Sequence, residues 1–542
     1  MPTLFIDDRP VNVPEGATVL DAARKLGIDI PALCYREGCE ANTSCMVCVV
    51  KVAGREGLVP SCAMPVQEGM RVQSETDEVR QGRKTALELL LSDHLGDCMA
   101  PCHSICPARM NIPLMIRQIA AGKLREAIAT IKADIALPAV LGRICPAPCE
   151  RGCRRAQHDA PVSICLLKRY AADVDLASGE PYLPDRAAAS GRSVAIIGAG
   201  PTGLSAAYYL LQHGHACTVF DDHPAPGGML RYGVEENRLP RDVLDAEIEI
   251  IERLGLEMRL GTRVGEAPAM DDLRKDFDAV FVAAGTVAEE QARTLGLSWD
   301  GKGVRANRRT YEADREGVFA ACGARQQKMA VRAVADGHAA AASIHQYLSG
   351  ETVAGPARPF TVHIGKLLSG EMEKFKVGVS AAGRVEPDDP SAGFSADEAA
   401  AEAQRCLHCD CRRAGDCKLR KYAAAYGASP TKYKMAERPT FEQHLQHSEV
   451  IFEPGKCIGC GLCVQVTARA GERLGLAFVG RGFDVRVTVP FAGSLADGLE
   501  RAAAGYADVG FRLAFTAPAE PLHLRLRRLL NSRGYLPELA GK

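Results

Sequence analysis

Cysteine is the residue that most constrains what this chain can fold into. The sequence has 21 cysteines among 542 residues, and many of them are separated by only two or three residues. An odd number of cysteines cannot all be paired in disulfides, and a chain of this length does not depend on a disulfide scaffold. Closely spaced thiols instead favour metal or redox sites. We therefore expect a reduced chain in which most cysteines bind metal.

Charge and hydropathy narrow the class of protein further. The 66 lysines and arginines nearly balance the 67 aspartates and glutamates, which argues against a nucleic-acid or anionic-membrane binding surface. No apolar run approaches the roughly 18 residues that a membrane span needs, and the opening residues do not form a signal peptide. The length predicts about three to four domains. We expect a cytoplasmic protein with no nucleic-acid partner and no membrane span.

The first group of cysteines follows a short β-rich segment. Residues 3–7 and 11–13 have the pattern of a strand hairpin, and residues 21–26 have that of a short helix. Four thiolates then occur at intervals that suit a 2Fe-2S cluster: Cys34, Cys45, Cys48 and Cys62. Zinc is the alternative, although intervals of ten and thirteen residues are unusual for zinc ribbons. Cys39 would fit the plant-type spacing only with a cysteine at Asn42, so we interpret it as a bystander.

The surroundings of these four cysteines carry a resemblance to a known domain. With Tyr35 after Cys34 and the segment 61–66 around Cys62, the arrangement closely resembles the N-terminal 2Fe-2S domain of the complex I 75 kDa subunit and related hydrogenases. The resemblance implies a β-grasp ferredoxin domain over residues 1–75.

A second set of cysteines brackets an amphipathic pattern, residues 112–131, that predicts two helices. Cys106-Pro-Ala and the run 142–150 resemble the N-terminal helical domain of the glutamate synthase small subunit and of dihydropyrimidine dehydrogenase. The resemblance implies a helical domain over residues 76–185 with two 4Fe-4S clusters. It gives one cluster Cys106, Cys145, Cys149 and Cys165, and the other Cys98, Cys102 and Cys153.

The second of these clusters lacks a fourth cysteine. His94 is the available donor, and its His-x3-Cys start resembles the His-ligated cluster of complex I and iron hydrogenases. The alternative for His94 is an exposed histidine at the end of a helix.

The middle of the chain contains the pattern of a dinucleotide-binding fold. A buried strand at 192–197 leads into a glycine-rich turn and a helix, and a second strand ends at Asp221. The turn contains Gly198, Gly200 and Gly203. Such glycines permit a tight turn and close approach of the backbone to a pyrophosphate at the helix N-terminus, while the acid accepts the ribose hydroxyls.

The segments that follow resemble the FAD domain of the glutamate synthase small subunit family over residues 190–352. They include Gly227 and Gly228, then Gly285 at the end of a returning strand. Family members insert an NADPH-binding domain there, but only residues 286–316 intervene here, so we do not expect NADPH on this chain. The family's Gly-Asp is replaced by Cys322 and Gly323. The alternative to FAD binding is therefore a fold that packs without flavin.

The C-terminal part carries the remaining cysteines. Residues 353–400 read as a connector, and residues 401–542 as a cysteine-rich, ferredoxin-like segment. A first set, Cys406, Cys409, Cys411 and Cys417, suits zinc or a cluster. A second set, Cys457, Cys460 and Cys463, suits a 4Fe-4S cluster whose fourth ligand comes from 406–417, from His444 or His447, or from a partner. We interpret Cys39, Cys217 and Cys322 as ordinary buried thiols.

Together these parts predict a multidomain α/β protein. It combines a β-grasp 2Fe-2S domain, a helical two-cluster 4Fe-4S domain, a single Rossmann-like FAD domain without the NADPH insertion, and a cysteine-rich C-terminal segment. Clusters carry single electrons, while a flavin exchanges a hydride pair for single electrons. We expect an electron-transfer subunit of an oxidoreductase, working with diaphorase, hydrogenase or formate dehydrogenase subunits. The alternatives are a self-sufficient NAD(P)H-dependent acceptor reductase and an assembly scaffold that contains zinc and iron.

Overall fold

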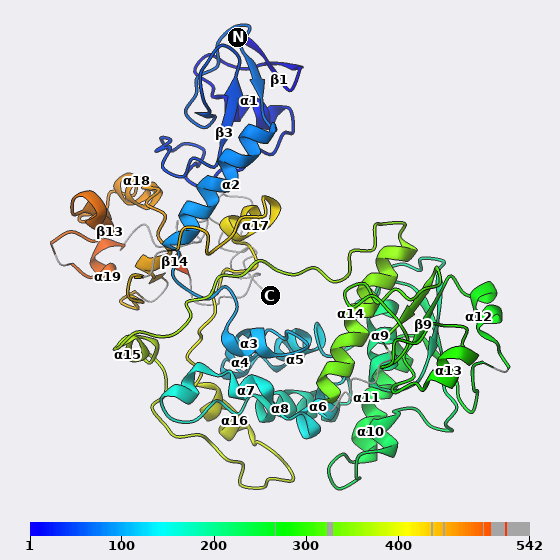
Figure 1. Cartoon of the computed structure of the whole chain (residues 1–542). Coiled ribbons are helices and arrows are strands. Elements are labelled where there is room, and N and C mark those ends of the chain that lie inside the picture. The colour runs from blue at the N-terminus through cyan, green and yellow to red at the C-terminus, as the bar shows by residue number, and fades with distance from the viewer. Residues whose placement is uncertain are drawn as a thin grey trace, which may run out of the picture. The chain divides into compact units, whose positions relative to one another are not determined.

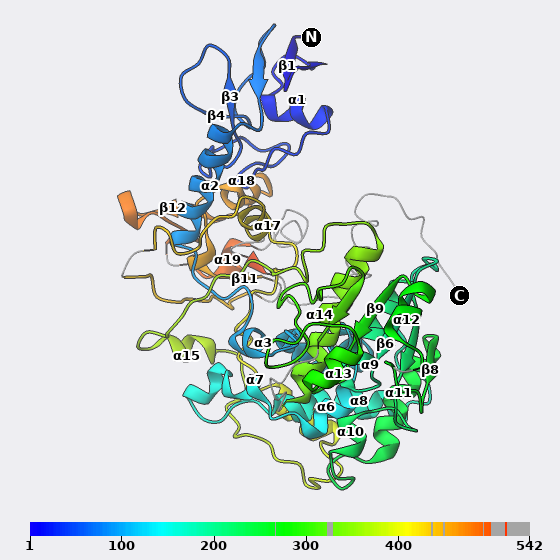
Figure 2. The ribbon, with the colours of Figure 1, turned by 45° about the vertical axis from the view of Figure 1, so that its right-hand side comes forward.

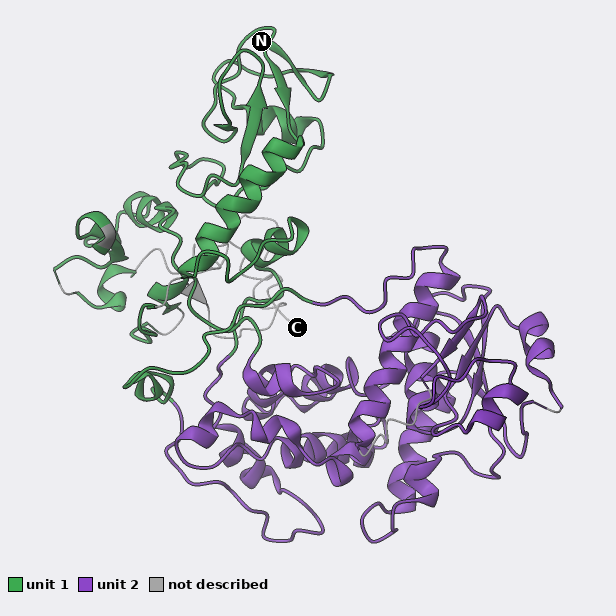
Figure 3. Cartoon of the chain, viewed as in Figure 1, with its two compact units in different colours: residues 1–99, 359–378, 410–542 green, residues 100–358, 379–409 purple. Residues whose placement is uncertain are grey.

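The polypeptide passes back and forth between two units. The computed structural model describes residues 1–265, 267–321, 329–434, 437–447, 450–491, 493–499 and 515–516. Unit 1 combines residues 1–99, 359–378 and 410–542, and unit 2 combines residues 100–358 and 379–409 (Figure 3). Both the predicted domain 76–185 and the predicted connector 353–400 are thus divided between the units.

Unit 1 begins with a five-stranded sheet in the order β2-β1-β5-β3-β4. Its strands are β1 (Thr3–Ile6), β2 (Arg9–Asn12), β3 (Val49–Val52), β4 (Val59–Pro60) and β5 (Arg71–Gln73). β1 pairs antiparallel with β2 and parallel with β5. Alternate side chains of β1, Leu4 and Ile6, are fully buried in one core with Val19 and Leu20 of α1 (Val19–Lys25). The predicted hairpin and helix are therefore present.

A long helix, α2 (Asp77–Ser92), follows this sheet and packs against α17 (Lys418–Ala425). The buried guanidinium of Arg83 on α2 donates hydrogen bonds to the carbonyl oxygens of Val49 and Ser74 and to the hydroxyl of Tyr426. Because its hydrogen-bond partners lie in both segments, Arg83 joins the N-terminal sheet to the C-terminal part of unit 1.

The rest of unit 1 is built from short elements. Its helices are α15 (Glu371–Phe375), η2 (Pro454–Lys456), α18 (Leu462–Arg469), η3 (Gly482–Asp484) and α19 (Leu495–Gly498). Its strands form two antiparallel pairs, β11 (Ile451–Phe452) with β14 (Phe515–Thr516), and β12 (Ala477–Val479) with β13 (Arg486–Thr488). The region is a set of loops around small apolar clusters, an arrangement suited to presenting ligands.

Unit 2 starts with a helical part. Its elements are α3 (Pro101–Ile105), α4 (Ile112–Ala120), α5 (Leu124–Lys132), α6 (Pro138–Ile144), α7 (Pro148–Arg151), η1 (Arg154–Gln157) and α8 (Ile164–Ala177), joined by α16 (Ala396–Ala403). The predicted amphipathic pattern becomes α4 and α5, whose buried faces include Ile116 and Ile128.

A parallel five-stranded sheet forms the second part of unit 2, in the order β10-β9-β6-β7-β8. Its strands are β6 (Ser193–Ile197), β7 (Ala216–Phe220), β8 (Leu256–Arg259), β9 (Ala279–Val282) and β10 (Val318–Ala320). Its helices are α9 (Pro201–Gln212), α10 (Met229–Tyr232), α11 (Arg241–Arg253), α12 (Met270–Asp276), α13 (Glu289–Thr294) and α14 (Ala330–Leu348). This strand order is that of a doubly wound nucleotide fold, whose ligands bind where the order reverses, here between β6 and β9.

Between β9 and β10, residues 286–316 are fully described and contain α13 together with isolated bridges such as Trp299 with Val304. No strand of a second sheet is present in that interval.

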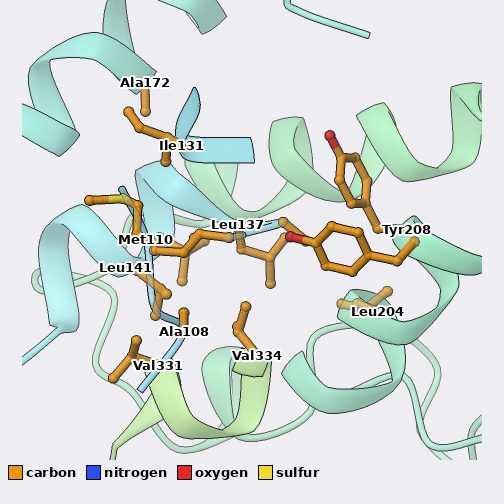
Figure 4. Packing of buried hydrophobic residues seen from close by; sticks show 14 of the residues in the cluster. Ala108, Met110, Ile131, Leu137, Leu141, Ala172, Leu204, Tyr208, Val331 and Val334 are labelled. Atoms are coloured by element: carbon orange, nitrogen blue, oxygen red, sulfur yellow. The ribbon is translucent and has the colours of Figure 1, made fainter. Parts of the chain in front are cut away.

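One hydrophobic core runs through both parts of unit 2. Figure 4 shows Met110 and Leu137 of the helical part packed in one cluster with Tyr208 of α9 and Val334 of α14. Figures 1 and 2 both show α14 lying along α9. Their close approach requires Gly337, where an added Cβ would lie 2.2 Å from the carbonyl oxygen of Thr202. The helical part and the dinucleotide fold are therefore one structural body.

No helix in the described part of the chain has the length and hydropathy required to cross a membrane.

Candidate metal centres and dinucleotide loop

The first candidate centre lies beside the N-terminal sheet. Cys34, Cys45, Cys48 and Cys62 are all buried, with at most 2% of each side chain exposed. Hydrogen bonds from Cys45 and Cys62 lower the pKa of Cys34, and a hydrogen bond from Cys62 lowers that of Cys48. The four sulfurs are thus neighbours. Four buried thiols beside this sheet have the donor chemistry of a 2Fe-2S site.

A second candidate centre lies after α2, also in unit 1. Its thiols are Cys98, Cys411 and Cys417. The pKa of Cys417 is raised to about 11, chiefly by burial and further by the negative charges of Cys411 and Cys98. The backbone holds this group together, because Cys411 N donates to Asp97 O at 2.9 Å and Cys98 N donates to Val362 O at 3.2 Å.

His94, four residues before Cys98, is the candidate for the fourth donor of this second centre. Burial lowers the pKa of His94 to about 4, and the nearby charge of Lys456 adds to the effect. Its Nδ1 is shielded from solvent and has no hydrogen-bond partner among the described residues. A neutral imidazole with an unpartnered buried nitrogen is suited to metal binding. His94, Cys98, Cys411 and Cys417 therefore fit a four-ligand iron–sulfur site.

A third candidate centre lies in unit 2 around Cys102, at α3. Burial raises the pKa of Cys102, and the negative charges of Cys406, Cys409, Cys153 and Cys149 raise it further. Cys406 and Cys409 follow α16, while Cys153 precedes η1. Segments about 300 residues apart in the sequence thus bring four thiols, Cys102, Cys153, Cys406 and Cys409, to one place.

The fourth candidate centre contains the set that the resemblance implied: Cys106, Cys145, Cys149 and Cys165. Cys106 ends α3, Cys145 ends α6, Cys149 lies in α7 and Cys165 in α8. A hydrogen bond from Cys165 lowers the pKa of Cys145 to about 6, and burial raises that of Cys149 to about 12.

Lys168 on α8 is buried among these four cysteines. Burial alone would lower its pKa, but the charges of Cys165, Cys145, Cys149 and Cys106 outweigh that effect, and the pKa of Lys168 is raised. A permanent cation beside four thiolates offsets the negative charge of a thiolate-ligated cluster.

We expect Lys168→Met to lower the reduction potential of this cluster by on the order of 100 mV, because a buried cation stabilises the reduced, more negative state. Redox titration followed by electron paramagnetic resonance measures the shift. Lys132→Met is the matched control, since Lys132 is also a buried lysine of unit 2 but faces Glu247. An equal shift in both variants would contradict the assignment.

Cys457, Cys460 and Cys463 form a further group in unit 1, at the start of α18. Burial raises the pKa of all three, that of Cys460 to about 11, with the charges of Cys457 and Cys34 contributing to the latter. This group therefore lies close to the first candidate centre.

The spacing of these cysteine groups bears on the zinc alternative. A tetrahedral zinc ion with Zn–S bonds of about 2.3 Å brings its sulfurs to about 3.8 Å from one another. Among the described residues, no three cysteine sulfurs lie within 4.8 Å of one another. The sequence also left open a single zinc ion held by the four cysteines of residues 406–417. In the structure, Cys406 and Cys409 belong to unit 2, whereas Cys411 and Cys417 belong to unit 1. The groups are more open than a single-ion site.

The glycine-rich loop lies at the carboxyl ends of β6 and β9. An added Cβ at Gly198 would lie 2.6 Å from Ala283 O, and one at Gly203 would lie 2.0 Å from Gly198 O, so packing within the fold requires both glycines. An added Cβ at Gly200 would meet no atom within 4 Å. Gly200 therefore leaves open space at the N-terminus of α9, where a pyrophosphate binds in this fold.

The other predicted residues of the loop gather around it. Gly227 N donates to Ala199 O at 2.8 Å, and an added Cβ at Gly228 would lie 2.8 Å from the Cα of Gly200. Asp221 accepts hydrogen bonds from Ala199 N at 2.6 Å and His223 N at 2.9 Å.

These contacts make Asp221 a support of the loop as well as a ribose-binding candidate.

Gly285, another predicted residue of the site, follows β9 with a φ of 70°. The predicted Cys322 and Gly323 lie outside the described residues.

Two features of the ligand sets differ from the sequence-based grouping. Cys98 and Cys102 are separated into different units, and Cys98 lies with Cys411 and Cys417 instead of with Cys102 and Cys153. The signal for this exchange is the count of ligands, because each of the two sets of seven cysteines is one ligand short of two complete sites.

Comparison with known families gives three matches along the chain. A model described as a 2Fe-2S iron-sulfur cluster binding domain matches residues 1–77. A model of dihydropyrimidine dehydrogenase domain II, 4Fe-4S cluster, matches residues 74–180, and an NAD(P)-binding Rossmann-like domain matches residues 196–253. The chain therefore carries a 2Fe-2S domain, a 4Fe-4S domain and a Rossmann-like domain, in the order predicted.

Curated relatives confirm the resemblance to redox enzymes. The chain is 43% identical over 218 residues to the NADP(+)-dependent formate dehydrogenase subunit beta of Moorella thermoacetica, covering 36% of this chain and 31% of that protein. It is 39% identical over 189 residues to the NAD-dependent dihydropyrimidine dehydrogenase subunit PreT of Escherichia coli, covering 34% and 45%. It is 36% identical over 208 residues to the glutamate synthase [NADPH] small chain of Mycobacterium tuberculosis, covering 38% and 42%. The chain spans less than half the length of each of these relatives.

Proposed function

We propose that this chain is an iron–sulfur and flavin electron-transfer subunit of a multi-subunit oxidoreductase. The observation that carries the proposal is the set of complete four-donor groups, one in the 2Fe-2S domain and three others assembled from distant segments. Iron–sulfur clusters supply one-electron transfer, and a flavin links it to hydride chemistry. We expect Cys457, Cys460 and Cys463 to hold a further cluster.

The side chains around the clusters would control their exposure to water and their local charge. In unit 1, one apolar cluster contains Cys34 and Cys45 of the first centre, with Cys98 and Cys417 of the second and Cys460 packed against it. Apolar packing around the ligands excludes water and tunes potentials. Buried lysines, Lys168 and Lys456, lie beside two of the centres.

We propose FAD as the occupant of the dinucleotide loop. The open space at Gly200, the N-terminus of α9 and the carboxylate of Asp221 fit the pyrophosphate and ribose of a dinucleotide. This fit does not distinguish FAD from a nicotinamide dinucleotide, and the resemblance of residues 190–352 to a FAD domain favours the flavin.

We expect Gly200→Ala to fold and to weaken flavin binding about tenfold or more, because the backbone φ of −78° accepts alanine while its Cβ occupies the open space. Flavin released by denaturation measures the retained cofactor. Gly383→Ala is the matched control, since its Cβ would also meet no atom within 4 Å but lies outside the loop. Retention of flavin by Gly200→Ala at the level of the control would contradict the assignment.

Metal and flavin analysis of the anaerobically purified chain tests the function. One 2Fe-2S and three 4Fe-4S clusters require about fourteen iron and fourteen sulfide per chain, before any contribution from the Cys457 group. Zinc in place of most of the iron would overturn the proposal and favour an assembly scaffold.

A second candidate, a self-sufficient NAD(P)H-dependent reductase, is favoured by the match of residues 196–253 to an NAD(P)-binding model. Bleaching of the flavin by NAD(P)H in the isolated chain would support it. If the flavin is reduced only after a partner subunit is added, the electron-transfer role stands. The name of the Moorella relative favours a formate dehydrogenase type of partner, with diaphorase and hydrogenase subunits as the other classes.

A further inference from the structure

We propose that Cys39 is the fourth ligand of a 4Fe-4S cluster held by Cys457, Cys460 and Cys463. The inference deepens the proposed function and rests on it. It also reverses the interpretation of Cys39 as a bystander.

The C-terminal loop needs a ligand from outside its own run. The bacterial ferredoxin pattern places its next cysteine where this chain has Thr467. The hydroxyl of Thr467 is buried, donates to Cys463 O at 3.1 Å and accepts from Leu476 N at 3.0 Å. Thr467 is thus engaged in the local structure of α18.

The other donors considered from the sequence have different surroundings. Cys411 and Cys417 accompany Cys98, and Cys406 and Cys409 accompany Cys102. His444 pairs through its backbone with Phe452 and lies 3.9 Å from the carboxylate of Glu442. The four cysteines of 406–417 are thus engaged elsewhere, and Cys39 is the further cysteine that packs with this loop among the described residues.

Cys39 packs on the same apolar cluster as the three cysteines. That cluster contains Cys463 and Leu462, and Cys39, Cys457 and Cys460 pack against it. The side chain of Cys39 is half-buried. All four cysteines belong to unit 1, although more than 400 residues separate Cys39 from the others.

Hydrogen bonds on the C-terminal side of Cys39 fix its loop to the cysteine loop. Glu40 N donates to Gln465 Oε1 at 2.9 Å, and Gln465 Nε2 donates to Glu40 O at 3.0 Å. Asn42 Nδ2 donates to Cys460 O at 2.6 Å. On the other side, an added Cβ at Gly38 would lie 3.6 Å from a guanidinium nitrogen of Arg469. The hydrogen bonds of Glu40 and Asn42 therefore hold the Cys39 loop against the first turn of α18 and the cysteine loop before it.

A 4Fe-4S cluster uses one protein ligand for each iron. With three cysteines, the iron without a protein ligand is lost on oxidation and leaves a 3Fe-4S centre. With Cys39 as the fourth, the cluster would join the 2Fe-2S domain to the C-terminal segment and resist this loss.

The test compares the anaerobically reconstituted full chain with its Cys39→Ala and Cys217→Ala variants. Cys217 is a buried thiol of β7 and serves as the control. The wild type and Cys217→Ala should hold about eighteen irons, for one 2Fe-2S and four 4Fe-4S clusters. Cys39→Ala should lose between one and four irons and, on mild oxidation, show the electron paramagnetic resonance signal of a 3Fe-4S centre or lack the fourth cluster altogether.

An unchanged iron content and spectrum in Cys39→Ala would overturn the inference while leaving the proposed function intact. A wild type that holds no iron would instead refute the proposed function. If Cys39→Ala does not fold, alkylation of the wild type decides. Cys39 should resist iodoacetamide in the iron-loaded chain and react after chelation, whereas reaction in the loaded chain would overturn the inference.

Discussion

Replacing Cys406 and Cys409 together with serine is expected to remove about four irons from the chain, because these residues complete the centre at Cys102 and Cys153. The loss should also weaken the attachment of α16 to the helical part, since a cluster that binds only the folded state stabilises it. Iron analysis and electron paramagnetic resonance of the reduced protein measure the first effect. Thermal unfolding of the anaerobic protein measures the second.

The paired variant Cys411→Ser with Cys417→Ser is the internal comparison. It should also remove about four irons, but the resonance that disappears should be a different one, because these cysteines accompany Cys98 and His94 in the other unit. If both paired variants removed the same signal, or the same zinc ion, the division of residues 406–417 between two centres would be wrong.

Replacing Arg405 with methionine is expected to destabilise unit 2 by about 3–5 kcal/mol, because it leaves a buried carboxylate without its partner. Arg405 and Glu402 are both fully buried, and Arg405 Nη1 donates to Glu402 Oε1 at 2.8 Å. Further hydrogen bonds from Arg405 to Ala160 O and Ala382 O, each 3.0 Å long, join three separate segments of unit 2. Denaturant titration of the anaerobic protein measures the change.

Two further variants test the cause of this loss. Arg405→Met combined with Glu402→Gln should recover part of the stability, since the unpaired charge is removed. Arg293→Met removes an exposed ion pair with Glu289 in the same unit and should cost no more than about 1 kcal/mol. Similar losses for Arg405→Met and Arg293→Met would show that the buried pair does not hold the segments.

Sequence reasoning reached the parts of this fold that depend on local pattern. The strand hairpin at Thr3–Asn12, the dinucleotide turn at Gly198–Gly203 and the four cysteines from Cys34 to Cys62 each lie within one short stretch, where periodicity and spacing report the geometry directly. The grouping of Cys106 with Cys145, Cys149 and Cys165 came from the resemblance, because spacing alone does not connect these distant residues.

The division of the remaining cysteines could not be reached in the same way. Cys98 and Cys102 are four residues apart, yet the chain passes from one unit to the other between them. Spacing describes how close two residues are along the chain, and a ligand set also depends on which distant segments the tertiary fold brings back. The buried cations at Lys168 and Lys456 were missed for the same reason, since neither lysine lies in a cysteine motif.

The return of the chain to unit 1 has a consequence for biosynthesis. Cys411 is made 313 residues after Cys98, which at about 5–20 residues per second corresponds to roughly 15–60 seconds of translation. During that interval His94 and Cys98 have been made without Cys411 and Cys417, and all of unit 2 is synthesised between Cys98 and Cys411. If this proposed centre holds a cluster, the cluster is completed only after Cys417 has been synthesised.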